Sequence, residues 1–293
     1  VSVPLTRIDT SKITLYNIND NDKTGFADAI NAAKAADVVV MSLGEAADMS
    51  GEAKSKSNLQ LPGVQEELLK AIYKTGKPVV LLINAGRPLI FNWASDNIPS
   101  ILYTWWLGTE AGNAIADVLF GDYNPAGKLP ISFPRTEGQI PIYYNHFNTG
   151  RPAKDENDKN YVSAYIDLQN SPKYPFGYGL SYTTFALGNM KLSSDKLSRD
   201  NKLTVTVDIT NTGNYDGEEV VQLYVRDLVG CVVRPVKELK GFQKVMVKKG
   251  ETKQLTFTLT PEDLKFFNNQ IEYINEAGDY ELFIGNSSDA GLK

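Results

Sequence analysis

Continuous apolar runs that alternate with helical patterns fill the first 120 residues of this 293-residue chain. The runs predict strands buried on both faces, because a strand with one exposed face alternates apolar and polar residues. The patterns between them, apolar at every third or fourth position, predict helices. Buried strands joined by helices are typical of a mainly parallel sheet covered on both faces, which is a three-layer α/β/α sandwich.

The bounds of these elements follow from the pattern. The expected strands span residues 13–18, 37–44, 78–84 and 100–104. The expected helices span residues 26–36, the stretch striped by Val64, Leu68 and Ile72 and ended by Gly76, a short segment near 88–94, and 109–120. Gly121 follows the last helix, where glycine favours the left-handed conformation of a C-cap.

The pattern changes after residue 184, where short strands alternate with turn signals. The expected strands span 203–210, 220–226, 236–247, 252–260 and 280–284. Such spacing predicts an all-β sandwich of immunoglobulin or fibronectin type III kind. We therefore expect an α/β domain over residues 1–183, which includes a linking segment at 135–183, and a fibronectin type III-like domain over 184–293. Two domains also agree with a length of roughly 150 residues per domain.

Charge and residue counts exclude several classes of partner. The chain has 30 Lys and Arg against 35 Asp and Glu, a net charge of -5, without a concentrated basic face, so we expect no nucleic acid partner. Cys231 and His146 are the only residues of their types, which leaves no basis for a disulfide framework or a zinc site. No apolar run approaches the roughly 18 residues that predict a membrane span.

The start of the chain indicates a piece of a longer protein. It begins at Val1 without an initiator Met and without the charged and apolar regions of a signal peptide. We expect that processing or a chosen boundary removed the preceding residues, together with any address signal.

An acidic loop over residues 44–62 follows the strand predicted at 37–44. In open α/β sheets ligands bind beyond the carboxyl ends of the strands, so this loop lies where a site is expected. It carries Glu45, Asp48 and Glu52 among small and polar residues. From spacing alone, a solvated acidic loop without a function is the favoured interpretation, because loops are polar in general.

A set of motifs in unbroken order resembles the C-terminal half of glycoside hydrolase family 3, the β-glucosidase family, and its periplasmic bacterial branch in particular. The motifs are Ser50-Gly-Glu52, Leu59-Gln-Leu-Pro62, Asn84-Ala-Gly-Arg-Pro88, the stretch 106–134, Tyr143-Tyr-Asn-His146, 148–152, 174–185, Thr210-Asn-Thr-Gly213, 234–242 and 278–280. Together they cover nearly the whole chain.

The resemblance implies a three-part retaining enzyme. A (β/α)8 barrel, which would precede Val1, supplies the sugar pocket and an aspartate nucleophile. The α/β domain supplies the general acid/base, and Glu52 matches that residue by its place in the Ser-Gly-Glu motif. The implied substrate is a terminal β-D-glucosyl residue of a β-glucoside or short oligosaccharide. The implied partner is the barrel of the same protein, the implied compartment is periplasmic or extracellular, and no metal or organic cofactor is required.

Several residues near the site have alternative interpretations. Glu45 and Asp48 are the rival carboxylates on the loop, and Glu45 is also a candidate for substrate binding. His146, in the polar linking segment, is the second substrate-binding candidate, against a structural role that we favour. Lys54 and Lys56 stand where many family members have arginine or another polar residue, and we expect solvated charges there.

Other motifs favour architecture over chemistry. Trp105 and Trp106 end a predicted strand and are expected to serve packing more than a sugar platform. Glu110 falls in a predicted first helical turn, where a carboxylate suits the macrodipole. Residues 176–182 resemble a fragment of a nucleotide-binding loop but lack its third glycine and its strand-to-helix context, so no dinucleotide site is expected.

Two other functions remain open from the sequence. In one, the chain is a non-catalytic carbohydrate-binding or structural fragment. In the other, the same fold acts on xylosides or arabinosides, which this sequence does not exclude because the specificity residues would lie mostly in the barrel. On every one of these interpretations the chain alone is expected to be inactive. The oligomeric state is left open, with a dimer as one alternative.

Overall fold

The structure, a computed structural model, describes residues 21–289 and 291–293 in two compact units. The first, here the α/β unit, comprises residues 21–123 and Pro134–Ile140. The second, here the sandwich unit, comprises Asn124–Phe133 and Pro141–Lys293. The strand expected over 13–18 lies outside the described residues.

The α/β unit is built on a parallel sheet, as the sequence predicts. Its strands are β1 (Val39–Gly44), β2 (Val79–Asn84) and β3 (Ser100–Tyr103), in the order β1-β2-β3. Val39 pairs with Val79 and Gly44 with Asn84, so β1 and β2 end level with each other. The central strand is the most deeply buried, because Leu81 and Ile83 have no exposed surface. The carboxyl ends of the strands therefore share one edge, where loops are free to build a site.

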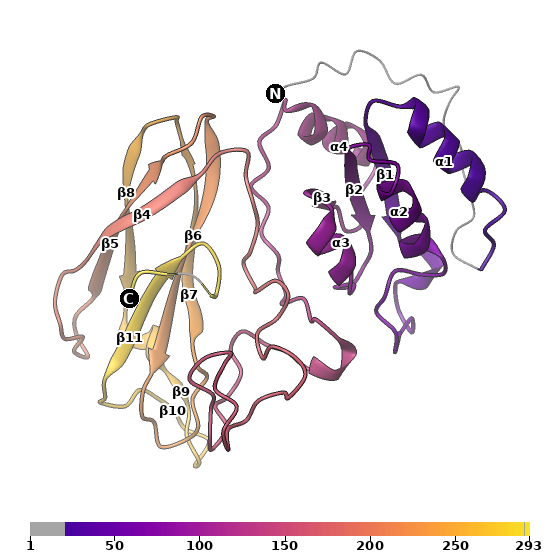
Figure 1. The fold of residues 1–293 in the computed structure, drawn as a ribbon. Helices are drawn as coiled ribbons and strands as arrows, with labels where there is room; N and C mark the ends of the chain where they lie inside the picture. Colours follow the sequence, from indigo (N-terminus) through magenta and orange to yellow (C-terminus); the bar gives the residue numbers. More distant parts are fainter. Residues whose placement is uncertain (1–20, 290) are drawn as a thin grey trace. The chain divides into compact units, whose positions relative to one another are not determined.

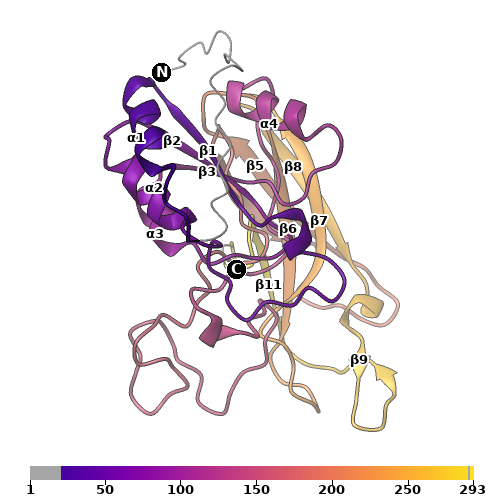
Figure 2. The same ribbon diagram turned by 90° about the vertical axis from the view of Figure 1, so that its right-hand side faces the viewer.

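Four helices accompany this sheet. They are α1 (Phe26–Ala35), α2 (Gln65–Tyr73), α3 (Asn92–Asn97) and α4 (Ala111–Phe120). Figure 2 shows α1, α2 and α3 on one side of the strands and α4 on the other. Gly121 caps α4 with a φ of 86°, as expected for a left-handed C-cap. Helix α4 has no buried residue, so the predicted inward face at Ala111, Ile115 and Val118 is only partly covered in the described residues.

The helix predicted near residues 88–94 is displaced toward the carboxyl terminus. Two backbone donors of this segment bind tertiary acceptors: Leu89 N donates to Tyr103 Oη at 3.2 Å, and Ile90 N donates to Leu59 O at 2.8 Å. Ile90 forms a parallel bridge with Gln60, and α3 begins only at Asn92. The apolar residues that predicted a helix, Leu89 and Phe91 among them, are buried side chains of this segment.

The sandwich unit contains two three-stranded antiparallel sheets (Figure 1). One has the order β4-β5-β8 and the other β11-β6-β7. Their strands are β4 (Phe185–Leu192), β5 (Leu203–Asn211), β6 (Gly217–Asp227), β7 (Glu238–Val247), β8 (Thr252–Leu259) and β11 (Tyr280–Gly285). A short hairpin of β9 (Phe266–Phe267) and β10 (Tyr273–Ile274) is separate.

The core of the sandwich follows from the period of two that predicted it. Every second residue of β5 is buried, and Val205, Val207 and Ile209 have no exposed surface. Their cluster includes Val221 and Ile284 from the opposite sheet. Burying each such side chain contributes about 1.5–3 kcal/mol, so this interface between the sheets is the main source of stability in the unit.

Strand β4 was not predicted, because its pattern is broken. The pairing of β4 with β5 shifts register between Gly188 and Lys191, and Asn189 has a φ of 53°. A bulge of this kind places consecutive side chains out of alternation. The apolar residues of β4 therefore show no clean period of two in the sequence.

Residues 124–133 and 141–183, which we expected to belong to the α/β domain, cluster with the sandwich unit. Buried Gln222 on β6 donates from Nε2 to Gly177 O at 3.2 Å. Gly177 has a φ of 79°, and a Cβ atom there would lie 2.2 Å from Gln222 Oε1. The glycine-rich motif at 176–182 thus has a packing role. The domain boundary after residue 183 stays a prediction.

Among the residues that the structure describes, no helix has both the length and the apolar character needed to cross a bilayer.

Candidate active site

The acidic loop leaves the sheet at Gly44, the last residue of β1. Its φ is 136°, and a Cβ atom would lie 1.9 Å from Asn84 O, so only glycine fits. Buried Gln65, at the start of α2, accepts from Gly44 N at 2.7 Å and donates to Gly44 O at 2.8 Å. The point at which the loop begins is therefore fixed to both the neighbouring strand and the following helix.

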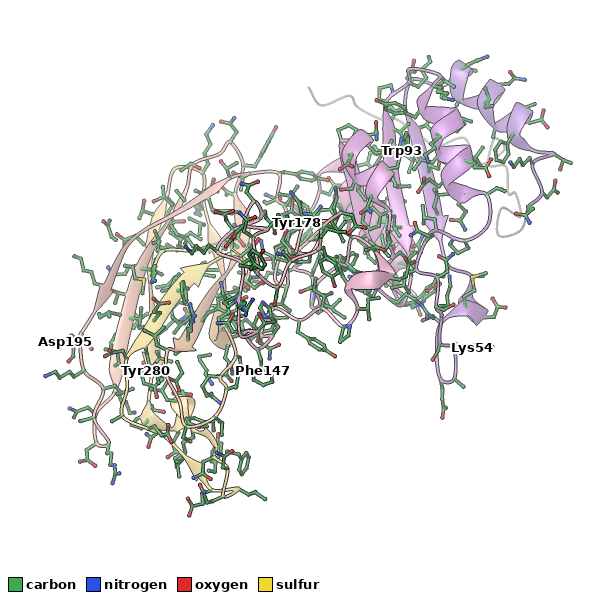
Figure 3. The ribbon with its side chains drawn as sticks, turned by 60° about the horizontal axis from the view of Figure 1, so that its bottom comes forward. Lys54, Trp93, Phe147, Tyr178, Asp195 and Tyr280 are labelled. Carbon is green, nitrogen blue, oxygen red and sulfur yellow. The ribbon has the colours of Figure 1, made fainter. Side chains whose placement is uncertain are left out.

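Glu52 lies exposed within this loop. The 3-10 helix η2 (Ala47–Met49) comes first, and a turn then closes as Lys54 N donates to Gly51 O at 3.2 Å. Glu52 and Ala53 are the central residues of the turn, and Ala53 has a positive φ of 59°. Figure 3 shows Lys54 near the tip of the loop, away from the strands. The turn thus presents the Glu52 carboxyl group outward from the sheet edge.

Glu45 has the opposite environment, because its side chain is completely buried. Arg87 Nε lies 2.9 Å from Glu45 Oε1 and donates to Oε2 at 3.1 Å. Lys56 Nζ lies 3.4 Å from Glu45 Oε1, so this lysine faces a carboxylate and differs from the solvated charge that we expected. Gly86 N also donates to Oε2 at 3.4 Å. This burial favours a structural role for Glu45 over substrate binding, which stays an alternative prediction.

Arg87 connects Glu45 to the rest of the loop. Its Nη2 donates to Met49 O at 2.5 Å and to Lys54 O at 2.9 Å. The carbonyl of Arg87 accepts a hydrogen bond from the hydroxyl of Tyr103 on β3. Burial raises the pKa of this tyrosine well above its ordinary value, so Tyr103 is a neutral donor at physiological pH. The arginine is therefore tied to the sheet by its backbone and to the loop by its side chain.

The far end of the loop is held at Leu59. Glu137, which begins the 3-10 helix η3 (Glu137–Gln139), accepts from Leu59 N at 2.9 Å. Burial alone would raise the pKa of Glu137, but hydrogen bonds from Leu59 N, its own backbone and Gln60 lower the pKa below its usual range. Glu137 is thus an anionic acceptor at neutral pH. The loop that carries Glu52 is anchored at its start, its middle and its end.

The other candidates near the loop are exposed or packed elsewhere. Asp48 lies exposed on η2, and Glu110 is the exposed N-cap residue of α4. Trp105 packs edge-on against Tyr103 with ring centroids 4.8 Å apart. Trp106 is 45% exposed at the same sheet edge. Trp105 therefore has a packing role, whereas Trp106 stays a candidate for either packing or a sugar platform.

His146 belongs to the other unit. Its side chain is exposed, with Nδ1 3.1 Å from Phe147 O, and its carbonyl accepts from Val236 N at 3.0 Å. Glu45 and Glu52 thus share one loop, whereas His146 is held by the sandwich unit. A role for His146 in substrate binding stays a prediction. Nowhere in residues 21–289 or 291–293 do three or more Asp, Glu, His or Cys side chains form a group that would hold a metal ion.

Sequence analysis missed the roles of Arg87 and Glu137. Arg87 was identified only as one residue of the Asn84-Ala-Gly-Arg-Pro88 motif. A usable signal was present, because Arg87 and Glu45 follow the ends of two apolar strands, and neighbouring parallel strands end at the same edge of a sheet. No comparable signal pointed to Glu137, whose partner Leu59 is 78 residues away.

Comparison with known protein families divides the chain in two. The description "Glycosyl hydrolase family 3 C-terminal domain" matches residues 4–182. The description "Fibronectin type III-like domain" matches residues 219–288. The first match contains the whole acidic loop and Arg87, and the second contains most of the sandwich.

Similar curated proteins are longer than this chain. A periplasmic beta-glucosidase of Salmonella typhimurium is 52% identical over 88% of this chain and 34% of its own length. A beta-xylosidase of Formosa agariphila is 44% identical over 94% of this chain and 37% of its own length. The chain therefore spans about a third of the length of these relatives.

Solved structures agree with this relationship. A beta-glucosidase from Listeria innocua in complex with gluconolactone superposes with a TM-score of 0.90 at 42% identity, covering 94% of this chain and 38% of that one. A beta-glucosidase from Kluyveromyces marxianus gives a TM-score of 0.77 at 34% identity, over 91% of this chain and 32% of that one. The α/β fold followed by a fibronectin type III-like sandwich is thereby confirmed.

Proposed function

We propose a function for this chain on the premise that it belongs to glycosyl hydrolase family 3, whose C-terminal domain matches residues 4–182. In this proposal the chain is the C-terminal part of a retaining β-glucosidase. It supplies Glu52 as the general acid/base, and a domain outside this chain supplies the sugar pocket and the carboxylate nucleophile. The supporting observation is that Glu52 lies exposed on a loop anchored at three places at the carboxyl edge of a parallel sheet.

The chemistry requires two carboxyl groups with different roles. In retaining hydrolysis one carboxylate attacks the anomeric carbon while the other protonates the leaving oxygen, and the second then removes a proton from the attacking water. The two groups stand about 5–5.5 Å apart. Glu52 suits the proton-transfer role because its turn presents it outward, where a second domain with a bound β-glucoside can approach. Buried Glu45 lacks that access.

Substitution of Glu52 in the full-length enzyme tests the proposal. With Glu52→Gln, kcat/KM for a β-glucoside with a poor leaving group should fall about 10²–10⁴-fold, because proton transfer to that group is lost. Glycosylation from an activated aryl β-glucoside should be largely spared, since its leaving group departs without a proton. Asp48→Asn, an exposed carboxylate on the same loop, is the matched control and should leave both rates unchanged. Equal losses on both substrates would contradict the proposal.

The isolated chain offers a second test of the division of labour. Alone it should not turn over an aryl β-glucoside, and addition of the separately produced N-terminal part should restore turnover. Hydrolysis by the chain alone would contradict the placement of the nucleophile outside it. A non-catalytic carbohydrate-binding or structural role would instead predict that Glu52→Gln leaves the full-length enzyme unimpaired.

A β-xylosidase is the second candidate function. It is supported by the beta-xylosidase of Formosa agariphila, which is 44% identical to this chain. Steady-state kinetics of the full-length enzyme on matched aryl β-glucoside and β-xyloside decide between the two. We favour the glucoside because the relative at 52% identity is named a beta-glucosidase.

We further propose a periplasmic or extracellular location, because the same relative is named a periplasmic enzyme. Fractionation of cells that produce the full-length protein should place it in the periplasm or the medium. Recovery with the cytoplasmic fraction would contradict this assignment.

A further inference from the structure

One guanidinium group contacts both sides of the turn that carries Glu52. Arg87 Nη2 donates to Met49 O, three residues before Glu52, and to Lys54 O, two residues after it. The two limbs of the turn therefore bind the same nitrogen atom. The turn itself is closed by the 3.2 Å hydrogen bond from Lys54 N to Gly51 O, so the contacts of Arg87 are what connect both limbs of the turn to the residues that follow β2.

Glu45 fixes the direction of this guanidinium. The carboxylate is completely buried, and a buried charge is tolerated only with a charged partner. Arg87 Nε supplies that partner on one edge of the guanidinium, which leaves Nη2 directed at the loop carbonyls. A planar fork makes these contacts at the same time, whereas the ammonium group of lysine is a point charge that cannot. The arrangement thus depends on arginine and not only on positive charge.

Gly86 also constrains the position of the loop that carries Glu52, and it does so without a charged group. A Cβ atom on Gly86 would lie 1.9 Å from Ser50 Oγ, 2.9 Å from Ser50 Cβ and 2.7 Å from Trp106 Nε1. Rotation of the Ser50 hydroxyl would not make room, because its Cβ is also too close. Even a methyl group at Gly86 would therefore push the loop that carries Glu52 away from β2.

We infer that Arg87, oriented by Glu45, is a positioning residue that sets the placement of the Glu52 carboxyl group at the glycosidic oxygen. This inference rests on the proposed role of Glu52. It assigns to Arg87 an effect on proton transfer and not on sugar binding, because the contacts of its guanidinium group within the described residues are with the loop and Glu45. For a substrate with a poor leaving group, loss of Arg87 should therefore lower kcat and leave KM nearly unchanged.

The test uses the full-length enzyme and the leaving-group comparison. Arg87→Lys should lower kcat for a β-glucoside with a poor leaving group by about 10- to 100-fold, since a misplacement near 1 Å has an effect of that size. For an activated aryl β-glucoside, kcat/KM, which reports the glycosylation step alone, should change less than about threefold, and so should the inhibition constant of glucose, both well below the effect of misplacing the acid. Arg199→Lys, an exposed arginine of the sandwich unit, is the matched control and should have no effect.

Two further variants separate positioning from general damage. Gly86→Ala should reproduce the leaving-group selectivity of Arg87→Lys without any change of charge. The double variant with Glu52→Gln and Arg87→Lys should be no slower than Glu52→Gln alone, because Arg87 acts through Glu52. Losses that multiply in the double variant would overturn the inference.

The outcomes also distinguish the inference from the proposed function beneath it. If Glu52→Gln shows the leaving-group selectivity and Arg87→Lys does not, the inference is wrong while the role of Glu52 stands. If Glu52→Gln itself shows no selectivity, the proposed function is wrong and the inference falls with it. Equal losses on both substrates together with a lowered melting temperature for Arg87→Lys would also overturn the inference, because they indicate a purely structural residue.

Discussion

Each unit contains a buried carboxylate that faces an arginine, and the two arginines direct their remaining N–H groups differently. In the α/β unit, Arg87 faces Glu45 and donates to two carbonyls of the loop that carries Glu52. In the sandwich unit, Arg234 faces Asp227 at 3.5 Å and donates to Glu238 on β7 at 2.8 Å. Its guanidinium also lies 4.0 Å from the centre of the Phe266 ring.

The difference concerns what each ion pair holds in place. The Arg87 cluster contacts the backbone of a loop, so its loss should move Glu52, the proposed acid/base. The Arg234 cluster acts on side chains of strands and on an aromatic ring, so its loss changes packing. We therefore expect similar pairs of residues to serve positioning in one unit and stability in the other, and the following predictions test this contrast.

Removing the carboxylate of each pair should give the largest difference. Glu45→Ala leaves Arg87 without its buried partner and should lower the free energy of unfolding of the α/β unit by about 3–5 kcal/mol. In the full-length enzyme it should also lower kcat for substrates with poor leaving groups. Urea unfolding and the two-substrate assay measure these effects.

Asp227→Ala is the counterpart in the sandwich unit. It should destabilise that unit and leave kcat unchanged, because the ion pair and hydrogen bond of Arg234 are with Asp227 and Glu238, both residues of the sandwich unit. A kcat loss that depends on the leaving group in Asp227→Ala would remove the contrast between the two clusters.

Two buried glutamines extend the comparison at a smaller scale. Gln65 bonds both backbone groups of Gly44, and Gln222 bonds the carbonyl of Gly177. Gln65→Ala leaves two buried backbone groups unpaired and should cost about 1–3 kcal/mol of stability for each unsatisfied group. Gln222→Ala removes a buried partner of the Gly177 and Asn286 carbonyls and should destabilise the sandwich unit by a comparable amount per unsatisfied group. Only Gln65→Ala should also loosen the acidic loop, measured as faster amide hydrogen exchange at residues 45–54.

A uniform rise in exchange across both units in the Gln65 variant would contradict this assignment, since it would report global unfolding. Gln254→Ala, on exposed strand surface of β8, is the matched control for a glutamine substitution.

The contrast between the units also explains what the sequence could predict. Residues 203–210 predicted β5 closely because every second side chain enters one core, and that period is local. Glu52 could be proposed from the sequence because its motif is contiguous. Arg87 acts on Glu45, 42 residues away, through strand ends that only the folded sheet brings together. The start of α3 and the bulged strand β4 were missed for the same reason, because contacts between residues distant in sequence determine their backbone conformation.

The pH dependence of Asp227 gives the smallest and most specific effect. Burial raises the pKa of Asp227 above its ordinary value, and nearby Glu276 and Glu238 act in the same direction, although Arg234 opposes them. A carboxyl group with a raised pKa in the folded state favours folding when protonated. That contribution is present below the unfolded pKa, near 3.8, and is lost as the pH rises through the folded value.

Asp227→Asn removes this titration and keeps the shape of the side chain. Relative to the unsubstituted chain, the melting temperature of the variant should therefore improve as the pH rises from about 3.5 to 7, because only the unsubstituted chain must ionise a buried carboxyl group. Asp208→Asn is the informative control, because hydrogen bonds from Asn189 and Gln254 lower the pKa of Asp208. The melting temperature of this variant, relative to the unsubstituted chain, should therefore fall as the pH rises over the same range. Opposite slopes would show that the attraction between Asp227 and Arg234 is weaker than the cost of burying the charged carboxylate. The pair would then contribute to stability through packing. Parallel slopes would mean that Arg234 compensates fully for burial, and the sandwich pair would then resemble the Arg87 cluster more closely than the contacts indicate.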